Sequence, residues 1–556
     1  MTKIVLVALS SPGHYSYWNS LSAETLAGDL RGHFRDQINV QVVDMACDAA
    51  PDYISGRIAH SRPDIIGFSV YPGTAGKCLD IVRRLDGLPI IQERKPLLAF
   101  GNKVPTYFPE QFLRSDLRSV VVMGEAEDSF RGLVEHVTSK RPLESIPNLA
   151  FMSVGGLRTT ERSLPDPQTL VHPPGLDTIP RVLRNGGNAL VQTSRGCSWS
   201  ECSFCIINSW RLGQAWAALP TDRVLANIRQ LAQAGVSEIE FADDDFMGPE
   251  NDDAFERLRT IAQGIADAGR ESATTGRITF RIFLNPHQVY RPSDGQWNAR
   301  VRTLLLELRE AGLVKVYIGL DSGCESQLRR YRRPATLRHI EGALGTLRSL
   351  RIGIDVGFIM FDPLLRLQEM IENVRTFREW NLIEHNQWPF RPMEVYPGAM
   401  MFAEMRDRGL LGVEDSNFGA YAYAYDDPRV QRIAEAIDHL SQPYRALFYA
   451  LKSISKRQYD LSRKDQTTLR AQHYVEQNGL VFLELMEAAG LAFLDSQPDA
   501  LDSLCDHARE VIHGLVCSID REISEGLIAD SDGFLRLQIA CLRDTILSPK
   551  SITIGT

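Results

Sequence analysis

Three cysteines lie within nine residues of one another, and their spacing constrains the chemistry of this chain more than any other feature. Cys197, Cys202 and Cys205 follow the pattern C-x4-C-x2-C and come shortly after the apolar run 189–191. Three thiolates on one loop can bind three irons of a [4Fe–4S] cube and leave the fourth iron open. An open iron is typical of a cluster that takes part in a reaction rather than only storing electrons.

Other uses of three cysteines are less favoured by the sequence. A structural zinc site normally has four protein ligands. The nearest histidines, His172 and His287, lie far from the loop in sequence. Disulfides would leave one thiol over and are rare in a reducing compartment.

Composition narrows the class of protein. The chain has 556 residues, a net charge of −9 and no long basic run, which argues against a nucleic-acid surface. The N-terminal apolar run Ile4–Leu9 is too short for a secretory signal and is typical of a buried strand. No apolar run is long enough for a membrane span. The six other cysteines are scattered, mostly in apolar patterns that predict core positions. We therefore expect a cytoplasmic protein of several domains.

The first third alternates strands with helices, which predicts a doubly wound, Rossmann-like parallel sheet. The expected strands are Ile4–Leu9, Asn39–Asp44, Asp64–Val70, Pro96–Asn102 and Ser119–Glu125. Ligands of such sheets bind at the carboxyl ends of the strands. Small or polar residues stand there in this chain: Ser10, Ser69, Gly73, Thr74, Gly101, Asn102, Gly124, Glu125 and Glu127.

The region 146–188 is rich in proline and glycine and is expected to form a linker with a small hairpin at Asn148–Arg158. Strands and helices alternate again over 189–410, which predicts a partial parallel barrel with its site at the carboxyl ends of the strands. The expected strands are Ala189–Thr193, Glu238–Ala242, Ile278–Phe283, Lys315–Leu320, Ile354–Ile359 and Trp388–Val395. From 411 to 556 apolar residues recur at three- and four-residue spacing, which predicts a helical domain that caps the barrel or docks a partner.

Residues 1–410 resemble the cobalamin-dependent radical SAM enzymes, a family with a B12-binding domain before its barrel. The matching segments are "DIIGFSVYPGT", "LLAFGN" and "VVMGEAEDSF" in the first domain. The cysteine loop, "EIEFADDDF", "LREAGLVKVYIGLDSGCESQL", "GIDVGFIMFDP" and "EVYPGAMMF" follow in the second. The chain departs from the family in the longer first cysteine gap and in Asp321-Ser322, where the family has Glu-Ser. It also lacks the D-x-H-x-x-G motif that supplies a histidine to cobalt, and His14 is a weak substitute.

The resemblance implies two domains joined by a linker: a cobalamin-binding domain over 1–145, the linker 146–188 and a radical SAM partial (β/α)6 barrel over 189–410. The helical region 411–556 lies outside it. The resemblance also implies a [4Fe–4S] cluster on Cys197, Cys202 and Cys205, together with S-adenosylmethionine (SAM) and cobalamin. In the family, an electron from the cluster cleaves SAM to a 5′-deoxyadenosyl radical. The implied SAM contacts are Phe204, Asp243, Arg281 and Ser322, with Asp244 and Asp245 as alternatives to Asp243.

For cobalamin the implied contacts are the strand-end residues named above together with Tyr71. Tyr396, Pro397 and Gly398 are further contact candidates. No general acid or base is implied, because radical chemistry at carbon does not require one.

The leading functional hypothesis is methylation of an unactivated carbon in a specialised metabolite. A radical rearrangement or cyclisation with bound cobalamin is the alternative among enzymes. A non-catalytic metal-binding interaction protein is the alternative outside them. The expected partners are a small-molecule or peptide substrate and an electron donor such as flavodoxin or ferredoxin, with no nucleic acid and no membrane.

Overall fold

The structure is a computed structural model, and it describes residues 1–9, 18–45, 50–113, 118–273, 275–386, 389–417, 419–455, 465–530 and 533–546. Ser10, His14, Cys47 and Trp388 lie outside these ranges. The chain divides into two compact units. The first unit contains residues 1–316, 331–334 and 394–423, and the second contains residues 317–330, 335–393 and 424–556.

A seven-stranded sheet forms the N-terminal part of the first unit, in the order β2-β1-β3-β4-β5-β6-β7. The strands are β1 (Thr2–Leu9), β2 (Ile38–Met45), β3 (Ile65–Ser69), β4 (Leu97–Gly101), β5 (Ser119–Val122), β6 (Leu149–Ser153) and β7 (Gly156–Thr159). The first five are parallel, and β6 and β7 continue the sheet as antiparallel strands. The hairpin expected in the linker thus extends this sheet.

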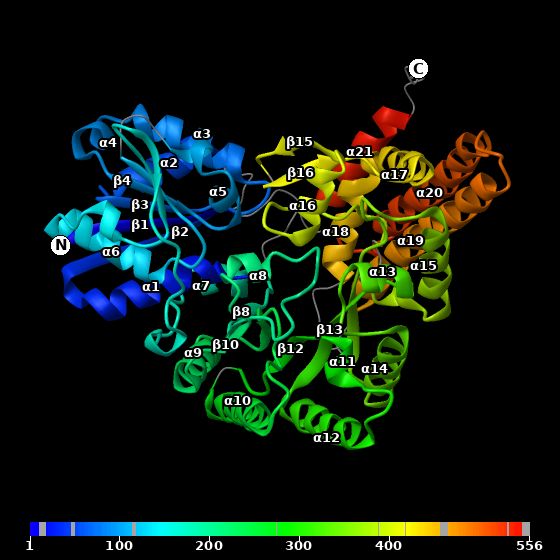
Figure 1. Cartoon of the computed structure of the whole chain (residues 1–556), viewed down its shortest axis with the longest axis horizontal. Coiled ribbons are helices and arrows are strands. Elements are labelled where there is room, and N and C mark those ends of the chain that lie inside the picture. Colours follow the sequence, from blue (N-terminus) through cyan, green and yellow to red (C-terminus); the bar gives the residue numbers. More distant parts are fainter. Residues whose placement is uncertain are drawn as a thin grey trace. The chain divides into compact units, whose positions relative to one another are not determined.

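Helices cover both faces of this sheet (Figure 1). They are α1 (Leu21–Phe34), α2 (Pro51–His60), α3 (Ala75–Asp86), α4 (Pro89–Arg94), α5 (Lys103–Tyr107) and α6 (Glu127–Ser139). Because side chains alternate along a strand, β1 contributes to two cores. Val5, Val7 and Leu9 pack in one core with residues of α2 and α3. Ile4, Leu6 and Ala8 pack in the other with residues of α1 and α6. The doubly wound fold is confirmed.

The first unit also holds the beginning of the second α/β sheet. Its strands are β8 (Ala189–Val191), β11 (Glu238–Phe241) and β12 (Thr279–Leu284), which are parallel and ordered β8-β11-β12. The helices here are α7 (Ile179–Arg184), α8 (Ile207–Trp210), α9 (Thr221–Gln233), α10 (Asp252–Glu271), α11 (Pro286–Val289), α12 (Gly295–Ala311) and α16 (Met400–Asp407). A short antiparallel pair, β9 (Ser194–Gly196) with β10 (Trp216–Ala218), brackets the cysteine loop.

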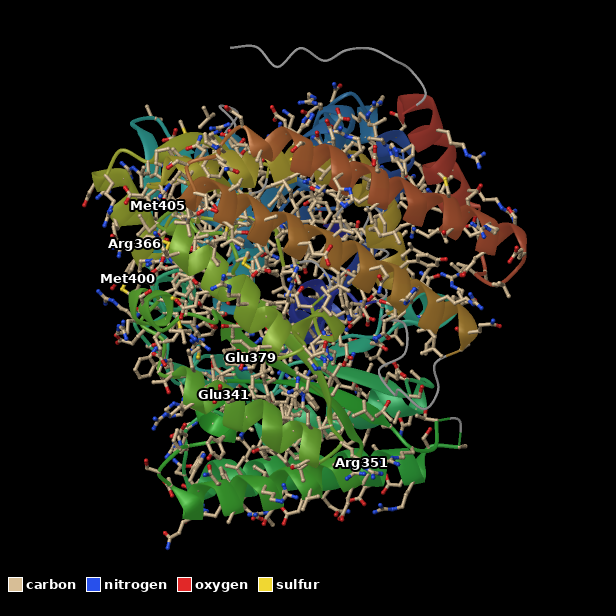
Figure 2. The ribbon with its side chains drawn as sticks, turned by 90° about the vertical axis from the view of Figure 1, so that its right-hand side faces the viewer. Glu341, Arg351, Arg366, Glu379, Met400 and Met405 are labelled. Carbon is tan, nitrogen blue, oxygen red and sulfur yellow. The ribbon has the colours of Figure 1, made fainter. Side chains whose placement is uncertain are left out.

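Strand β13 (Leu313–Asp321) follows β12 in the sheet order, and its last residues belong to the second unit. There β14 (Gly353–Phe358) is its neighbour. The helices of this unit are α13 (Glu325–Arg330), α14 (Leu337–Ser349), α15 (Leu367–Glu379), α17 (Pro428–Ser441), α18 (Arg445–Ser455), α19 (Gln466–Leu494), α20 (Ala500–Ser524) and α21 (Phe534–Ile546). Figure 2 marks the ends of α15 by Arg366 and Glu379. Long helices from α17 onward confirm the predicted helical character of the C-terminal region.

Two predictions about regular structure were wrong. The described part of the expected strand Trp388–Val395 forms only isolated bridges, through Pro392 and Val395. Pro389 and Pro392 lack the N–H groups that a strand ladder requires. Residues just past 411 are not helical, because β15 (Leu411–Asp415) and β16 (Ala420–Tyr423) form a hairpin before the first C-terminal helix.

Among the described helices, none combines the length and the apolar character that a membrane span requires.

Candidate functional site

The cysteine loop connects β9 to α8. Cys197, Cys202 and Cys205 are free thiols, with Cys202 buried and the other two partly exposed. Two nitrogen donors point at their sulfurs. The Nη1 of Arg333 lies 3.2 Å from Cys202 Sγ, and the Nδ2 of Asn285 lies 4.0 Å from Cys197 Sγ.

These residues fit an iron–sulfur cluster. Burial raises the pKa of Cys197 to about 11 and that of Cys205 to about 12, so both thiols must lose a proton on binding iron. Within the described ranges, no three His, Cys, Asp or Glu side chains converge on a point as ligands of one metal ion do. A cubane differs from such a site because each thiolate binds a different iron, which spaces the sulfurs more widely. The N–H donors beside the sulfurs suit thiolate ligands.

Asp245 anchors the cysteine loop through hydrogen bonds. Its carboxylate is fully buried and accepts hydrogen bonds from Ser198 N at 3.0 Å and Ser198 Oγ at 2.5 Å. It also accepts from Gly248 N at 3.1 Å and Gln288 Nε2 at 2.9 Å. Ser198 follows Cys197 directly, so Asp245 fixes the backbone beside the first cysteine. The sequence suggested a carboxylate here only as an alternative SAM contact.

Asp243 holds the segment that leads into the loop. Its buried carboxylate accepts from Thr193 N at 2.8 Å and from Ser194 Oγ at 2.8 Å. Burial raises its pKa to about 6, against the effect of these hydrogen bonds. Asp244, between the two, is one of the residues that line the cavity described next. The SAM contact of Asp243 stays a prediction.

A cavity of about 420 Å³ opens at the carboxyl ends of β3, β4 and β5, within the first unit. A pocket at this edge is expected of a doubly wound sheet. Six of the predicted cobalamin contacts line it: Ser69, Gly101, Asn102, Gly124, Glu125 and Glu127. Residues around the cysteine loop line it as well: Arg195, Gly196, Ile206, Ile207, Trp210, Arg211 and Asp244. The structure therefore brings the predicted cobalamin edge and the cysteine loop to one cavity.

Three further predicted cobalamin contacts, Tyr71, Gly73 and Thr74, are described by the structure but do not line the cavity. Gly73 adopts φ +83° and Thr74 donates from Oγ1 to the carbonyl of Tyr71 at 2.8 Å, so these residues form the turn before α3. The Tyr71 hydroxyl lies 2.7 Å from Ser22 Oγ, and burial raises its pKa. Tyr396 contacts a residue that lines the cavity. The Nζ of Lys103, which is one of the lining residues, lies 3.0 Å from the centroid of the Tyr396 ring.

Phe204 and Arg281, two of the predicted SAM contacts, each pack or pair with another side chain of the protein. Phe204 packs edge-on against Tyr331, with ring centroids 5.2 Å apart. Arg281 on β12 forms a buried ion pair with Glu240, its partner in register on β11. Trp18 also donates to Glu240, at 3.1 Å. The contact of Arg281 with SAM stays a prediction.

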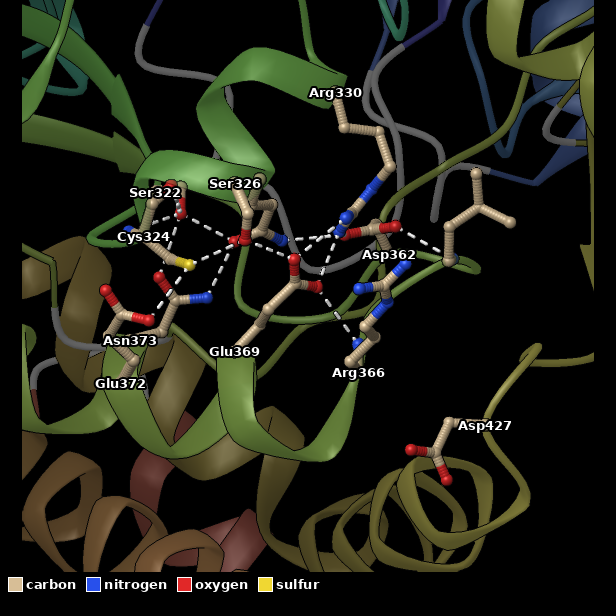
Figure 3. A network of polar contacts seen from close by, with 12 residues as sticks. Ser322, Cys324, Ser326, Arg330, Asp362, Arg366, Glu369, Glu372, Asn373 and Asp427 are labelled. Atoms are coloured by element: carbon tan, nitrogen blue, oxygen red, sulfur yellow. Dashed lines mark hydrogen bonds and ion pairs between the residues drawn. The ribbon is translucent and has the colours of Figure 1, made fainter.

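Ser322 belongs to a buried polar network in the second unit (Figure 3). Its hydroxyl lies 2.6 Å from Gln327 Oε1 and 2.9 Å from Asn373 Oδ1. Gln327 donates in turn to Asp362 at 2.6 Å. Arg330 completes the network through Asp362 at 3.2 Å and Glu369 at 3.0 Å. The network ties the turn after β13 to the loop after β14 and to the start of α15, and the contact of Ser322 with SAM stays a prediction.

We expect Arg330→Met to destabilise the second unit by about 3–5 kcal/mol, since it leaves buried carboxylates without their cation. Asp362 is completely buried and Glu369 nearly so. Arg375→Met is the matched control. Arg375 lies on α15, as Glu369 does, but it is 60% exposed in its pair with Glu487 and should contribute about 0–1 kcal/mol. Hydrogen exchange across α15 measures both variants, and equal exchange in the two would contradict the prediction.

A cluster of four buried charges lies between the loop after β5 and the cysteine loop; we call it the ion clamp. It contains Arg195 and Arg211 with Glu125 and Glu127. Burial raises the pKa of Glu127 and Arg195 lowers it, and the net pKa lies below the ordinary value. Sequence reasoning predicted both glutamates as cobalamin contacts and missed both arginines. No motif in the sequence pairs residues this far apart.

Gly196 stands between Arg195 and Cys197 with φ +81°. A Cβ at this position would lie 1.9 Å from the carbonyl oxygen of Ala215 and 2.9 Å from Arg211 Cδ. The backbone of the loop thus approaches its neighbours as closely as only glycine permits.

We expect Gly196→Ala to lower stability and iron retention much more than Gly213→Ala. Gly213 has a matching φ of +80° but open space around its Cβ position, so it isolates the backbone cost of about 1–2 kcal/mol. The clash at Gly196 should add roughly 1–3 kcal/mol. Thermal unfolding and iron analysis check this, and equal losses in both variants would contradict it.

Comparison with known protein families also finds a B12-binding part and a radical SAM part in this chain. The family model described as B12 binding domain matches residues 15–134, and the one described as Radical SAM superfamily matches residues 191–375. The chain is 26% identical over 400 residues to 4′-phospho-dehydrooxetanocin synthase of Priestia megaterium, which covers 70% of this chain and 51% of that protein. It thus spans about half the length of that relative. An uncharacterized methyltransferase of Pyrococcus horikoshii is 26% identical over 380 residues, covering 67% of this chain and 76% of that protein.

Among solved structures, the cobalamin-dependent SAM radical enzyme OxsB with aqua-cobalamin bound has a TM-score of 0.81 at 20% identity. The match covers 98% of this chain and 84% of OxsB. The radical SAM methyltransferase TsrM from Kitasatospora setae, with cobalamin and a [4Fe–4S] cluster bound, has a TM-score of 0.60 at 14% identity, covering 92% of this chain and 100% of TsrM. These two likenesses establish the fold.

Proposed function

We propose that this chain, a radical SAM protein with a B12-binding domain, cleaves SAM reductively and uses the resulting radical on a small-molecule or peptide substrate. The observation that supports this most is the single cavity lined both by predicted cobalamin contacts and by residues flanking the cysteine loop. A cluster and a corrinoid at these two places would face a common space. When bound, the cluster and SAM supply a 5′-deoxyadenosyl radical, and cobalamin supplies a transferable methyl group.

The residues of this chain would bind the cofactors and order the loop. Cys197, Cys202 and Cys205 would hold the cluster, while Asp243 and Asp245 fix the loop through hydrogen bonds to its backbone. Asp243 is retained as the candidate contact of the SAM ammonium group, and Asp244, which lines the cavity, is the alternative. Phe204, Arg281 and Ser322 are retained as candidate SAM contacts on the strength of the sequence resemblance. A flavodoxin- or ferredoxin-like electron donor and a cytoplasmic location are proposed on the same basis.

Within this chemistry we propose methylation of an unactivated carbon. The names of the relatives support two types of reaction. The Pyrococcus horikoshii relative is named a methyltransferase, and TsrM is known as a radical SAM methyltransferase. The first relative is named a synthase. Radical rearrangement or cyclisation without methyl transfer is therefore the second candidate.

The products of SAM distinguish these functions without a known substrate. The protein is reconstituted anaerobically with iron, sulfide and hydroxocobalamin and is then given SAM and a reductant. A methylating enzyme should release S-adenosylhomocysteine as well as 5′-deoxyadenosine, whereas a rearranging enzyme should release 5′-deoxyadenosine alone. Release of neither product would refute the enzyme assignment and favour a metal-binding interaction protein.

A further inference from the structure

The ion clamp holds the cysteine loop at both of its ends. Arg195 lies in β9, two residues before Cys197, and Arg211 follows α8, six residues after Cys205. Both guanidinium groups bind the same carboxylate, Glu125, one on each oxygen. Arg195 Nη1 lies 2.7 Å from Glu125 Oε2, and the Nη1 of Arg211 pairs with Oε1.

A second carboxylate fixes the orientation of Arg195. Glu127, the first residue of α6, binds Nη2 of Arg195 through Oε1 and lies 3.3 Å from Nη1 through Oε2. Such two-pronged pairing fixes the plane of a guanidinium group as well as its position. The side chains of Arg195, Arg211, Glu125 and Glu127 are 9%, 2%, 8% and 6% exposed. The four formal charges sum to zero, so the clamp is neutral as a unit.

Stability alone does not account for this arrangement. Buried ion pairs lose their hydration on folding, and well-packed apolar residues of similar volume are often as stable. Buried ions do constrain geometry, because removing or shifting one partner leaves another charge uncompensated. Here the constraint acts between the carboxyl edge of the B12-type sheet and the loop that carries the cysteines. All four residues also line the cavity that the two share.

We propose that the ion clamp is a positioning device that sets the distance and orientation between the cluster and the corrinoid. Arg195 and Arg211 fix the two ends of the cysteine loop, and Glu125 and Glu127 tie them to the loop after β5 and the start of α6. The inference rests on the proposed function, since it presumes that both cofactors bind. Neither arginine needs to contact a cofactor for this role.

Hydrogen exchange of the cofactor-free protein tests whether the ion clamp orders the cysteine loop. Glu125→Gln weakens both arginine contacts and should speed amide exchange in segment 196–212 by about tenfold or more. Arg195→Lys retains the charge but not the two-pronged geometry, so an intermediate increase is expected. Asp29→Asn is the matched control, because Asp29 is equally buried and pairs with Arg131 between α1 and α6. Unchanged exchange in Glu125→Gln, or an equal increase in Asp29→Asn, would overturn the proposal.

Pulsed dipolar electron paramagnetic resonance of the reconstituted protein tests whether the ion clamp sets the spacing of the two cofactors. The probes are the reduced cluster and cob(II)alamin, and the wild type should give one narrow distance distribution. Both Glu125→Gln and Arg195→Lys should broaden or shift it. In Arg195→Lys, which changes no predicted cofactor contact, iron content and corrinoid binding should stay within about twofold of the wild type. An unchanged distribution in both variants would refute a positioning role. If Glu125→Gln does not fold, Arg195→Lys decides both tests.

The same experiment separates this proposal from the proposed function. A wild-type protein that binds no corrinoid would refute the cobalamin assignment and with it the role in cofactor spacing. In that case the exchange measurement still reports whether the four charges order the cysteine loop. A wild type with both cofactors but variants of unchanged spacing would refute the clamp alone.

Discussion

Cys202→Ala should abolish SAM cleavage, with a loss of at least about a thousandfold. Cys202 is the most buried of the three loop cysteines, and Arg333 donates to its sulfur. Alanine at this position leaves two thiolates, which can hold at most two corners of a cubane. Iron after anaerobic reconstitution should fall from about four per chain to well below one, together with the absorbance of the cluster.

Cys517→Ala is the control for this prediction. Cys517 is an exposed cysteine on α20, in the second unit. Its replacement should leave iron content and SAM cleavage at the wild-type level, because an exposed thiol contributes little to packing. If Cys202→Ala retained four irons per chain and cleaved SAM, the cluster assignment would be wrong.

The fold could be predicted from local patterns wherever strands are buried on both faces. The apolar run Ile4–Leu9 and the expected strand Asp64–Val70 each became a parallel strand close to its expected place, β1 and β3. The expected strand Trp388–Val395 shows the limit of this reasoning. Its apolar residues matched a barrel strand, while Pro389 and Pro392 removed the donors that the ladder needs.

Some residues of the candidate site can be predicted from local sequence patterns, whereas others depend on contacts between distant parts of the chain. The spacing of the cysteines in the sequence predicts the cluster site. The topology of a doubly wound sheet predicts that strand-end residues such as Ser69 and Gly101 line a ligand site. The contacts that position the loop are made by residues far apart in the sequence. Arg195 meets Glu125 across 70 positions, and Ser198 meets Asp245 across 47. A single sequence has no periodicity that reports such pairs, because only the folded chain brings these residues together.

Asp245 illustrates why these hidden contacts matter, and its replacement should have the second largest effect. Asp245→Ala would leave four donors around a fully buried carboxylate without their acceptor: the N–H and O–H of Ser198, the N–H of Gly248 and the amide of Gln288. Each buried donor without a partner costs about 1–3 kcal/mol. We therefore expect a local loss of about 4 kcal/mol or more around the cysteine loop and a cluster that is lost soon after reconstitution.

Asp245→Asn sharpens the test because it keeps the shape of the side chain. Oδ1 accepts from Gly248 and Gln288, while Oδ2 accepts from Ser198. An amide has only one oxygen, so either set of donors must face an NH₂ group, and about half of the loss should remain. Asp253→Ala, at an exposed position in the first turn of α10, should cost only about 0.3–1 kcal/mol. Hydrogen exchange over 193–205 and the rate of iron release measure all three variants. Full cluster retention in Asp245→Ala would contradict the view that this carboxylate, rather than the cysteines alone, keeps the loop in its cluster-binding form.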